Sequence, residues 1–294
     1  ISGTLLGAAL LPATPPFTTG NYTPPAALGT VSAAAPTIDC AHDGSVLVLG
    51  DRNFNNGTGL NAGAVLLVTT EDGTQTWSKL PVTGAIDSER VGSQVACSPD
   101  GSVVVATSES ATTSLYVWNR QDDGSYLQVA RVSIRDASAL GETGPFDYPA
   151  GLALGYPTGL ALDDTGNVAV IGFVNRTVDT AGVAERCGGA LVCMKIDGTW
   201  QLSQALTLER VAGRAYEGKF GNSPCFSQDG TLVISAGQDV DIDSPAKTAQ
   251  RGRVHVFTRS GNTYTRTHRL ATANQPVYSN YGYGGHRTTA LMPS

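Results

Sequence analysis

The chain has 294 residues, a formal net charge of −6, and 15% charged residues, well under the roughly 25% of typical soluble domains. No block of basic residues is present, so we expect no nucleic-acid partner. The longest apolar run, near Leu5–Leu11, is far shorter than the about 20 residues of a membrane helix, so we expect no membrane span in this chain.

The first 36 residues do not share the pattern of the rest of the chain. Prolines and an alanine run predict an extended arm over residues 1–36, which could complete a sheet, bind a neighbouring subunit or serve as a linker. The chain begins at Ile1 rather than Met and stops at Ser294, inside what reads as the opening strand of a further repeat. We therefore expect a processed product or a fragment of a longer protein.

Residues 37–294 contain a phrase that returns at nearly constant spacing. Its copies are Cys40–Val48, Cys97–Val105, Leu162–Val170 and Phe226–Ile234, and their turn glycines are 57, 65 and 64 residues apart. Such a period predicts a repeat architecture. We place the units at 37–90, 91–155, 156–219 and 220–280, with a partial fifth unit at 281–294.

Each unit is predicted to begin with two short strands. The turn between them is Asp-Gly in three copies and Thr165-Gly166 in the third, which predicts a two-residue hairpin with positive φ at both positions. The β-branched runs that follow predict second strands buried on both faces, at 46–50, 103–107, 168–172 and 232–237. Cys40 and Cys97 stand where the other copies have Leu162 and Phe226, so we expect both thiols to be buried.

Two further strands complete each unit. The third strands are predicted at 63–68, 114–118, 189–193 and 252–257, and a second glycine turn follows each of them. The fourth strands start near Trp77, Tyr126, Trp200 and Tyr264 and alternate in polarity, as expected for outer strands with one wet face. Four-stranded units in tandem predict an all-β fold, a β-propeller of four-stranded blades.

The openings of the units carry a resemblance to a known family. Phe220-Gly221 opens the fourth unit, Val91-Gly92 and Tyr156-Pro157 are degenerate versions, and Tyr281-Gly282 or Tyr283-Gly284 would open a fifth. Together with the glycine turns, they make residues 37–294 resemble the FG-GAP family, the propeller repeat of integrin α subunits and of many microbial and viral surface proteins. The resemblance implies a propeller fold and says little about a ligand.

No catalytic constellation is predicted, so we expect a protein that is not an enzyme. Gly213–Lys219 matches most of a phosphate-binding loop, but Phe220 replaces the Mg²⁺-binding Ser or Thr and is better explained as a repeat opening. The sequence has no Gly-x-Ser-x-Gly elbow. The four histidines, at positions 42, 255, 268 and 286, are expected to be ordinary surface or strand residues.

Alternating carboxylates at Asp239, Asp241 and Asp243 have the spacing of a Ca²⁺ loop, since oxygen ligands suit a hard cation. Ser244 stands where such a loop takes glycine, and a solvated polar loop is the other interpretation. The stretch Asp51–Gly57 is open to the same two interpretations. Integrin-type repeats hold Ca²⁺ between the first and second strands. Those turns are short here, so the resemblance implies no calcium, and no other cofactor is expected.

Covalent modification is the last feature that the sequence suggests. Five cysteines, an odd number, argue against a complete disulfide framework, although Cys187 and Cys193 could pair. Asn21, Asn56 and Asn175 each begin an Asn-x-Thr triplet, which is a glycosylation site if the protein passes through a eukaryotic secretory pathway.

We therefore expect a non-catalytic structural or adhesive propeller module of an extracellular surface assembly: a filament, a sheath or a virion. Its partners would be other protein subunits of that assembly, a second copy among them, or a glycan. The loops Arg52–Ala62 and Phe173–Gly188 would carry binding. The alternatives are a phage or viral tail nozzle or fibre component, and a propeller-scaffold hydrolase with a loop metal site.

Overall fold

The computed structural model describes residues 37–54, 62–84, 88–110, 113–134, 156–174, 177–180, 183–186, 188–207, 219–240 and 250–270. These residues form four antiparallel sheets of four strands each and one separate two-stranded hairpin, so the all-β prediction is confirmed. Within these ranges, no helix is long and apolar enough to cross a membrane.

Each sheet is a meander of strands in chain order. Sheet 1 holds β1 (Thr37–Cys40), β2 (Val46–Asp51), β3 (Ala64–Glu71) and β4 (Thr74–Lys79); sheet 2 holds β5 (Gln94–Cys97), β6 (Val103–Thr107), β7 (Ser114–Arg120) and β8 (Tyr126–Ser133). Sheet 3 holds β9 (Gly159–Leu162), β10 (Val168–Phe173), β13 (Gly189–Ile196) and β14 (Thr199–Leu206); sheet 4 holds β15 (Phe220–Phe226), β16 (Leu232–Val240), β17 (Gln250–Ser260) and β18 (Thr263–Leu270). The predicted four strands per unit are confirmed.

One insertion departs from the prediction. The segment between β10 and β13, expected to be a loop, contains the hairpin of β11 (Thr177–Thr180) and β12 (Val183–Arg186). Thr177, Val178, Val183 and Thr180 are residues with high strand propensity, which explains why this stretch pairs with itself.

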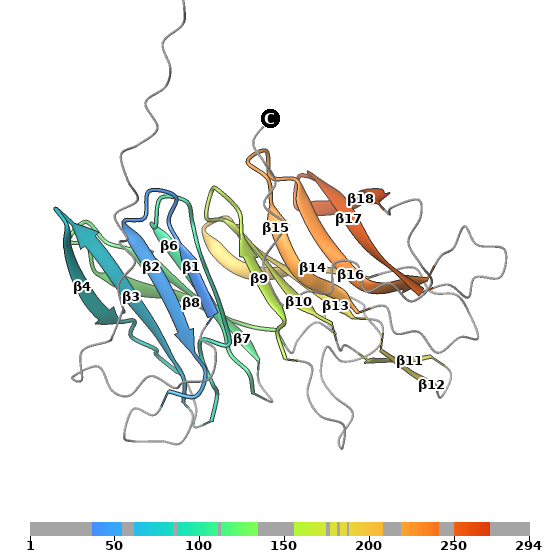
Figure 1. Ribbon diagram of the computed structural model, residues 1–294, viewed down its shortest axis with the longest axis horizontal. Helices are drawn as coiled ribbons and strands as arrows, with labels where there is room; N and C mark the ends of the chain where they lie inside the picture. Colours follow the sequence, from blue (N-terminus) through green and yellow to red (C-terminus); the bar gives the residue numbers. More distant parts are fainter. Residues whose placement is uncertain are drawn as a thin grey trace, which may run out of the picture.

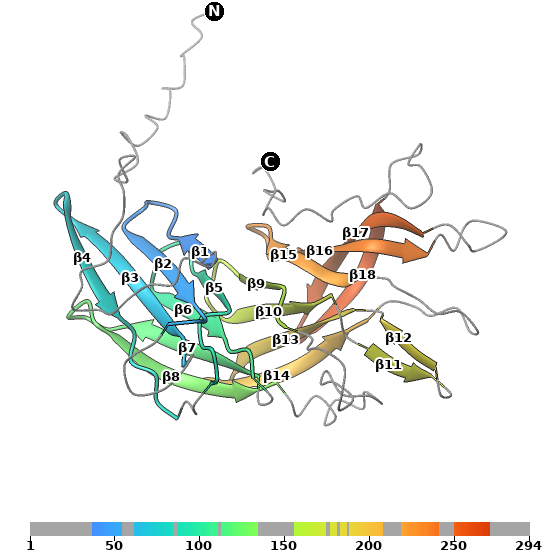
Figure 2. The same ribbon diagram turned by 60° about the horizontal axis from the view of Figure 1, so that its bottom comes forward.

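The sheets pack face to face in chain order, with their first strands together on the inside (Figures 1 and 2). The first strands contact one another in sequence: β1 lies against β5, β5 against β9, and β9 against β15. Sheets 1 and 4 therefore lie at opposite ends of a fan (Figure 1). This arrangement is consistent with consecutive blades of a β-propeller.

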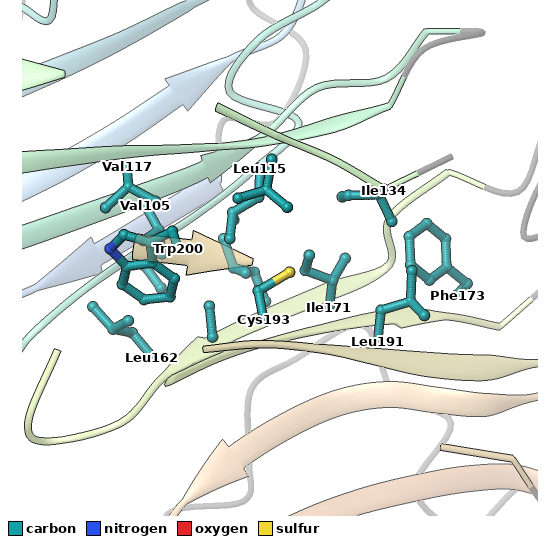
Figure 3. Packing of buried hydrophobic residues seen from close by; sticks show 14 residues of the cluster. Val105, Leu115, Val117, Ile134, Leu162, Ile171, Phe173, Leu191, Cys193 and Trp200 are labelled. Atoms are coloured by element: carbon teal, nitrogen blue, oxygen red, sulfur yellow. The ribbon is translucent and has the colours of Figure 1, made fainter. Parts of the chain in front are cut away.

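Apolar side chains fill the space between neighbouring sheets. Figure 3 shows the cluster between sheets 2 and 3, where Val105, Leu115 and Val117 face Ile171 and Cys193. Similar clusters join sheet 1 to sheet 2 and sheet 3 to sheet 4. The second strands β6 and β10 are almost entirely buried and the outer strand β18 alternates between buried and exposed, as predicted.

The turn between the first two strands differs from the predicted two-residue hairpin. Only the glycine has positive φ, for example 69° at Gly101, and no preceding Asp does. Gly101 N donates to Ser98 O at 2.9 Å, and Ser98 N donates to Val103 O at 2.9 Å, so the turn is longer. Asp100 Oδ1 accepts the Ser102 N–H at 2.9 Å. This hydrogen bond to the side chain stabilises the chain reversal between the two strands, so Asp100 does not need a left-handed backbone conformation.

Replacing Asp100 by alanine is expected to lower the free energy of unfolding by about 1 kcal/mol at pH 7. Burial opposes ionisation, but hydrogen bonds from Ser98 and Ser102 outweigh it and hold the pKa of Asp100 below its ordinary value. A carboxyl group whose pKa is lowered on folding stabilises the folded state at any pH above its pKa in the unfolded chain, about 3.9. This stabilisation is lost as the pH falls through the pKa of the group in the folded protein. Urea unfolding should therefore show a difference from the parent at neutral pH that shrinks in acid, whereas Asp164→Ala, at an exposed turn position, should change little at either pH.

The Phe-Gly-like openings mark places where two backbones meet. Val91 and Phe220 each form a parallel bridge to a glycine just before the third strand of the preceding sheet, Gly63 and Gly188. A Cβ added to Gly172 would lie 1.6 Å from the carbonyl oxygen of Gly221. Glycine is therefore required on both sides of this junction.

The exposure of each described cysteine depends on which sheet it belongs to. Cys97 is 7% exposed, as predicted, but Cys40 is exposed because, among the described residues, no further sheet packs against that side of sheet 1. Cys193 is a free thiol with 0% exposure, so it does not form the disulfide with Cys187 that the sequence allowed. Cys187 itself lies outside the described residues.

Candidate functional site

The proposed metal and glycosylation residues fall mostly outside the described part of the chain. Asp239 lies in β16, where its backbone pairs with Arg251 of β17. Asp241 and Asp243 lie outside the described residues, as do Asn21, Asn56 and Asn175, and these stay predictions. In the part of the chain that the structure describes, no group of three His, Cys, Asp or Glu side chains could hold a metal ion.

The other singled-out positions form no common site among the described residues. Asp51 accepts the Asn53 N–H at 3.0 Å, a bond within its own turn. His255 is fully buried in β17, where its ring stands edge-on to Phe220 with 5.4 Å between ring centres. His268 is exposed on β18 and His42 is exposed beside the first turn. Like Asp241, His286 lies outside the described residues.

The sheets instead bring together a group of charged residues that the sequence did not single out, which we call the arginine–glutamate cluster: Arg52, Glu89, Arg90, Glu109 and Arg131. They come from the ends of β2 and β6, from the connection between β4 and β5, and from β8. Glu89 and Glu109 are 0% and 4% exposed. Their separation along the chain left no spacing that could have revealed the cluster.

Glu109 is the meeting point of two arginines. Its side chain is 1% exposed and accepts Arg52 Nη1 at 2.7 Å and Arg90 Nη1 at 2.9 Å. Ser93 Oγ donates to the same carboxylate at 3.2 Å. The Arg52 guanidinium also lies 6.0 Å from the ring centre of Tyr156, the residue that opens the third unit. Glu109 thus links the first and second units, and Arg52 extends the contact to the start of the third.

Glu89 is the second buried carboxylate. It accepts Arg131 Nη2 at 2.8 Å and Ser108 Oγ at 3.3 Å. The Arg131 guanidinium lies 5.5 Å from the ring centre of Tyr116. Burial above all, with the negative charge of Glu89 nearby, raises the pKa of Tyr116 well above its ordinary value, so the phenol stays protonated.

The backbone around Glu89 is strained. The residues on either side of it, Ser88 and Arg90, have φ values of 62° and 56°. A left-handed residue other than glycine costs on the order of 1 kcal/mol, and it persists where its surroundings fix it. The ion pairs of Glu89 and Arg90 supply that restraint.

The geometry suits structural ties better than acid–base chemistry. A general base needs a free lone pair that faces a substrate, and a general acid needs a proton to give. Both glutamates are instead buried, and their oxygens accept hydrogen bonds from arginine and serine donors. The cluster therefore holds sheet 1, sheet 2 and the start of the third unit in register.

Above about pH 9 the fold is expected to lose stability steadily. Burial raises the pKa of Cys193, Tyr126 and Tyr264 to about 12 each. A group whose pKa is raised on folding stabilises the folded state. This stabilisation is complete below the pKa of the group in the unfolded chain, about 8.5 to 10, and it is lost as the pH rises through the pKa in the folded protein. Urea midpoints measured at pH 8 and pH 11 should fall less in Cys193→Ala than in the parent. An equal fall in both would show that this thiol does not contribute.

No family model matches the chain, and no curated protein matches it. Among the solved structures that resemble it are a periplasmic gluconolactonase, PpgL, of Pseudomonas aeruginosa, and the Dos1 propeller. The first is 14% identical over 83% of this chain and 74% of the other, with a TM-score of 0.39. The second is 14% identical over 83% and 52%, with a TM-score of 0.43.

Proposed function

We propose that the four sheets are blades of a β-propeller with FG-GAP-like repeats, and that this propeller is a non-catalytic structural or adhesive module of an extracellular surface assembly. The observation that carries the proposal is the arginine–glutamate cluster. It contains the two buried glutamates, Glu89 and Glu109, and three of the ion pairs found among the described residues. Both glutamates accept hydrogen bonds from arginines, and these bonds tie neighbouring sheets together.

A rigid scaffold of this kind is suited to presenting loops. The segment after β2 begins at Arg52 of the cluster, and the hairpin β11–β12 follows β10; the end of β2 and the hairpin both lie along the lower edge of the sheets in Figure 1. Binding residues are common on loops that a rigid framework positions. We propose that this edge of the sheets contacts a protein subunit of the assembly or a glycan.

The thiol chemistry is compatible with an oxidising exterior. Cys193 is fully buried and its raised pKa keeps it protonated, which protects it because the thiolate is the reactive form. The low charge content and the short polar turns also fit a protein that works outside the cell.

Immunogold electron microscopy of the native source, with antibody raised against the purified chain, tests the surface role. We expect label on the outside of intact cells, or on filaments or particles released from them. Label confined to the cell interior would refute the surface role. A hydrolase substrate screen tests the non-catalytic part, and turnover by the parent that Glu109→Gln abolishes would refute it.

A further inference from the structure

Six Asp-Gly pairs lie in the turns of the four sheets, and the structure divides them into two kinds. Their aspartates are Asp43, Asp72, Asp100, Asp123, Asp197 and Asp229. All six pairs belong to the described part of the chain, so their turns can be compared. Such a pair is prone to one intramolecular reaction, because glycine has no side chain to hinder attack by its amide nitrogen on the carboxyl group of the preceding aspartate.

In four of the pairs, a hydrogen bond holds the nitrogen that would attack. The amide nitrogens of Gly44, Gly101, Gly124 and Gly230 donate to the carbonyl oxygen three residues earlier, at 3.0, 2.9, 2.9 and 2.9 Å. Each carboxylate in turn accepts the backbone N–H two residues after it, at 2.8 to 3.0 Å. Both reacting groups are therefore engaged elsewhere, and the reaction would have to break these hydrogen bonds.

The same hydrogen bonds keep these four carboxyl groups ionised. Donors on serine and threonine hold the pKa of each below its ordinary value, at Asp100 against the opposing effect of burial. The reaction expels the hydroxyl of the carboxyl group as water, which requires the protonated form. A lowered pKa makes that form scarcer at neutral pH, so it adds to the protection.

The pairs Asp72-Gly73 and Asp197-Gly198 lack these restraints. They form the turns β3–β4 and β13–β14, where all four residues are exposed. Among the described residues, neither glycine nitrogen and neither carboxylate has a hydrogen-bond partner. A Cβ placed on Gly73 or Gly198 would meet nothing within 4 Å, so neither glycine is crowded.

The backbone at these two aspartates also eases the reaction. Asp72 and Asp197 have φ values of 48° and 50°, whereas none of the other four aspartates has a positive φ. A left-handed residue other than glycine carries a cost in free energy. Rotation of the aspartate toward the glycine nitrogen therefore starts from a strained conformation at these two sites.

We infer that Asp72 and Asp197 are sites of spontaneous isoaspartate formation, and that the turns of the other four pairs protect them. The glycine nitrogen bonds to Cγ of the aspartate and gives up its proton, and the carboxyl hydroxyl leaves as water, which closes a succinimide ring. Water then adds to one of the two ring carbonyls. Opening at the main-chain carbonyl routes the chain through the aspartate side chain and lengthens the main chain by one methylene group, whereas opening at the other carbonyl restores aspartate. Water is the only co-reactant, and the inference does not depend on the function proposed above.

Peptide mapping of the full chain after prolonged incubation at neutral pH tests the inference, with electron-transfer fragmentation to tell isoaspartate from aspartate. In the folded protein, we expect isoaspartate to form at Asp72 and Asp197 at least about tenfold faster than at the other four sites, because only those four must first break hydrogen bonds. In urea, where the turns are lost, all six pairs should react at similar rates. Asp72→Glu and Asp197→Glu are matched controls. Each should abolish the product at its own site, because glutamate closes its larger ring slowly, and should leave the other site unchanged.

Two outcomes would overturn the inference. One is a folded protein in which all six pairs react alike. The other is a folded protein in which Asp72 and Asp197 stay unmodified over the time in which the same residues react in urea. Asn56-Gly57, which lies outside the described residues, reaches isoaspartate through the same ring with loss of ammonia, and the fragment ions separate its product by position.

Discussion

Replacing Gly221 by valine is expected to lower the free energy of unfolding by about 4 kcal/mol, the combined cost of left-handed strain and overpacking. Gly221 has φ of 102°, and a Cβ there would lie 2.2 Å from the carbonyl oxygen of Gly189 and 2.8 Å from the amide nitrogen of Phe173. Both neighbours are backbone atoms of sheet 3, so neither can swing aside. Urea unfolding followed by tryptophan fluorescence measures the loss.

Gly198→Val is the matched control for this substitution. Gly198 has φ of 80°, but nothing lies within 4 Å of a Cβ placed there. It therefore reports the cost of the backbone conformation without the close approach, and we expect a loss of about 1 kcal/mol. Equal losses in the two variants would contradict the view that the Phe-Gly opening is needed for contact between sheets.

Replacing Arg131 by alanine is expected to cost about 3 kcal/mol, because it leaves a buried carboxylate without its cation. Glu89 is fully buried and pairs with Arg131 at 2.8 Å. Arg120→Ala is the control, since its partner Glu71 is 77% exposed and such surface pairs contribute at most about 1 kcal/mol. Urea unfolding at neutral pH measures both losses.

A second substitution separates charge from packing at this site. Arg131 also lies over the ring of Tyr116, so its removal takes away a contact as well as a charge. Adding Glu89→Gln to Arg131→Ala removes the unpaired charge and should recover part of the lost stability. If the double variant is no more stable than Arg131→Ala, the packing on Tyr116 is the main contribution.

The strand pattern was accessible from the sequence because it depends on neighbouring residues. The turn glycines have the positive φ that their positions indicated, for example 77° at Gly73 and 80° at Gly198. The aromatic at the start of each fourth strand was visible too. The structure adds its role in sheet 2, where the hydroxyl of Tyr126 donates to the carbonyl oxygen of Gly101 in the first turn.

Two predictions from the sequence were wrong because the outcome depends on the tertiary contacts of the residue. Asp100 was expected to be left-handed, but its carboxylate accepts the Ser102 N–H and makes the turn from an ordinary conformation. Cys40 was expected to be buried by analogy with Cys97. Its position in the repeat is the same, but it belongs to sheet 1, and no other described sheet packs against that side.

The sequence by itself determined the repeat, the four-stranded meanders and the apolar faces, because periodicity and turn residues act over a few neighbouring positions. Only the tertiary structure decided which charged residues meet. Arg52, Glu109 and Tyr156 belong to three different units and come together through the stacking of whole sheets. No spacing along the chain encodes that meeting, since it depends on the angle and register at which each sheet packs on the next.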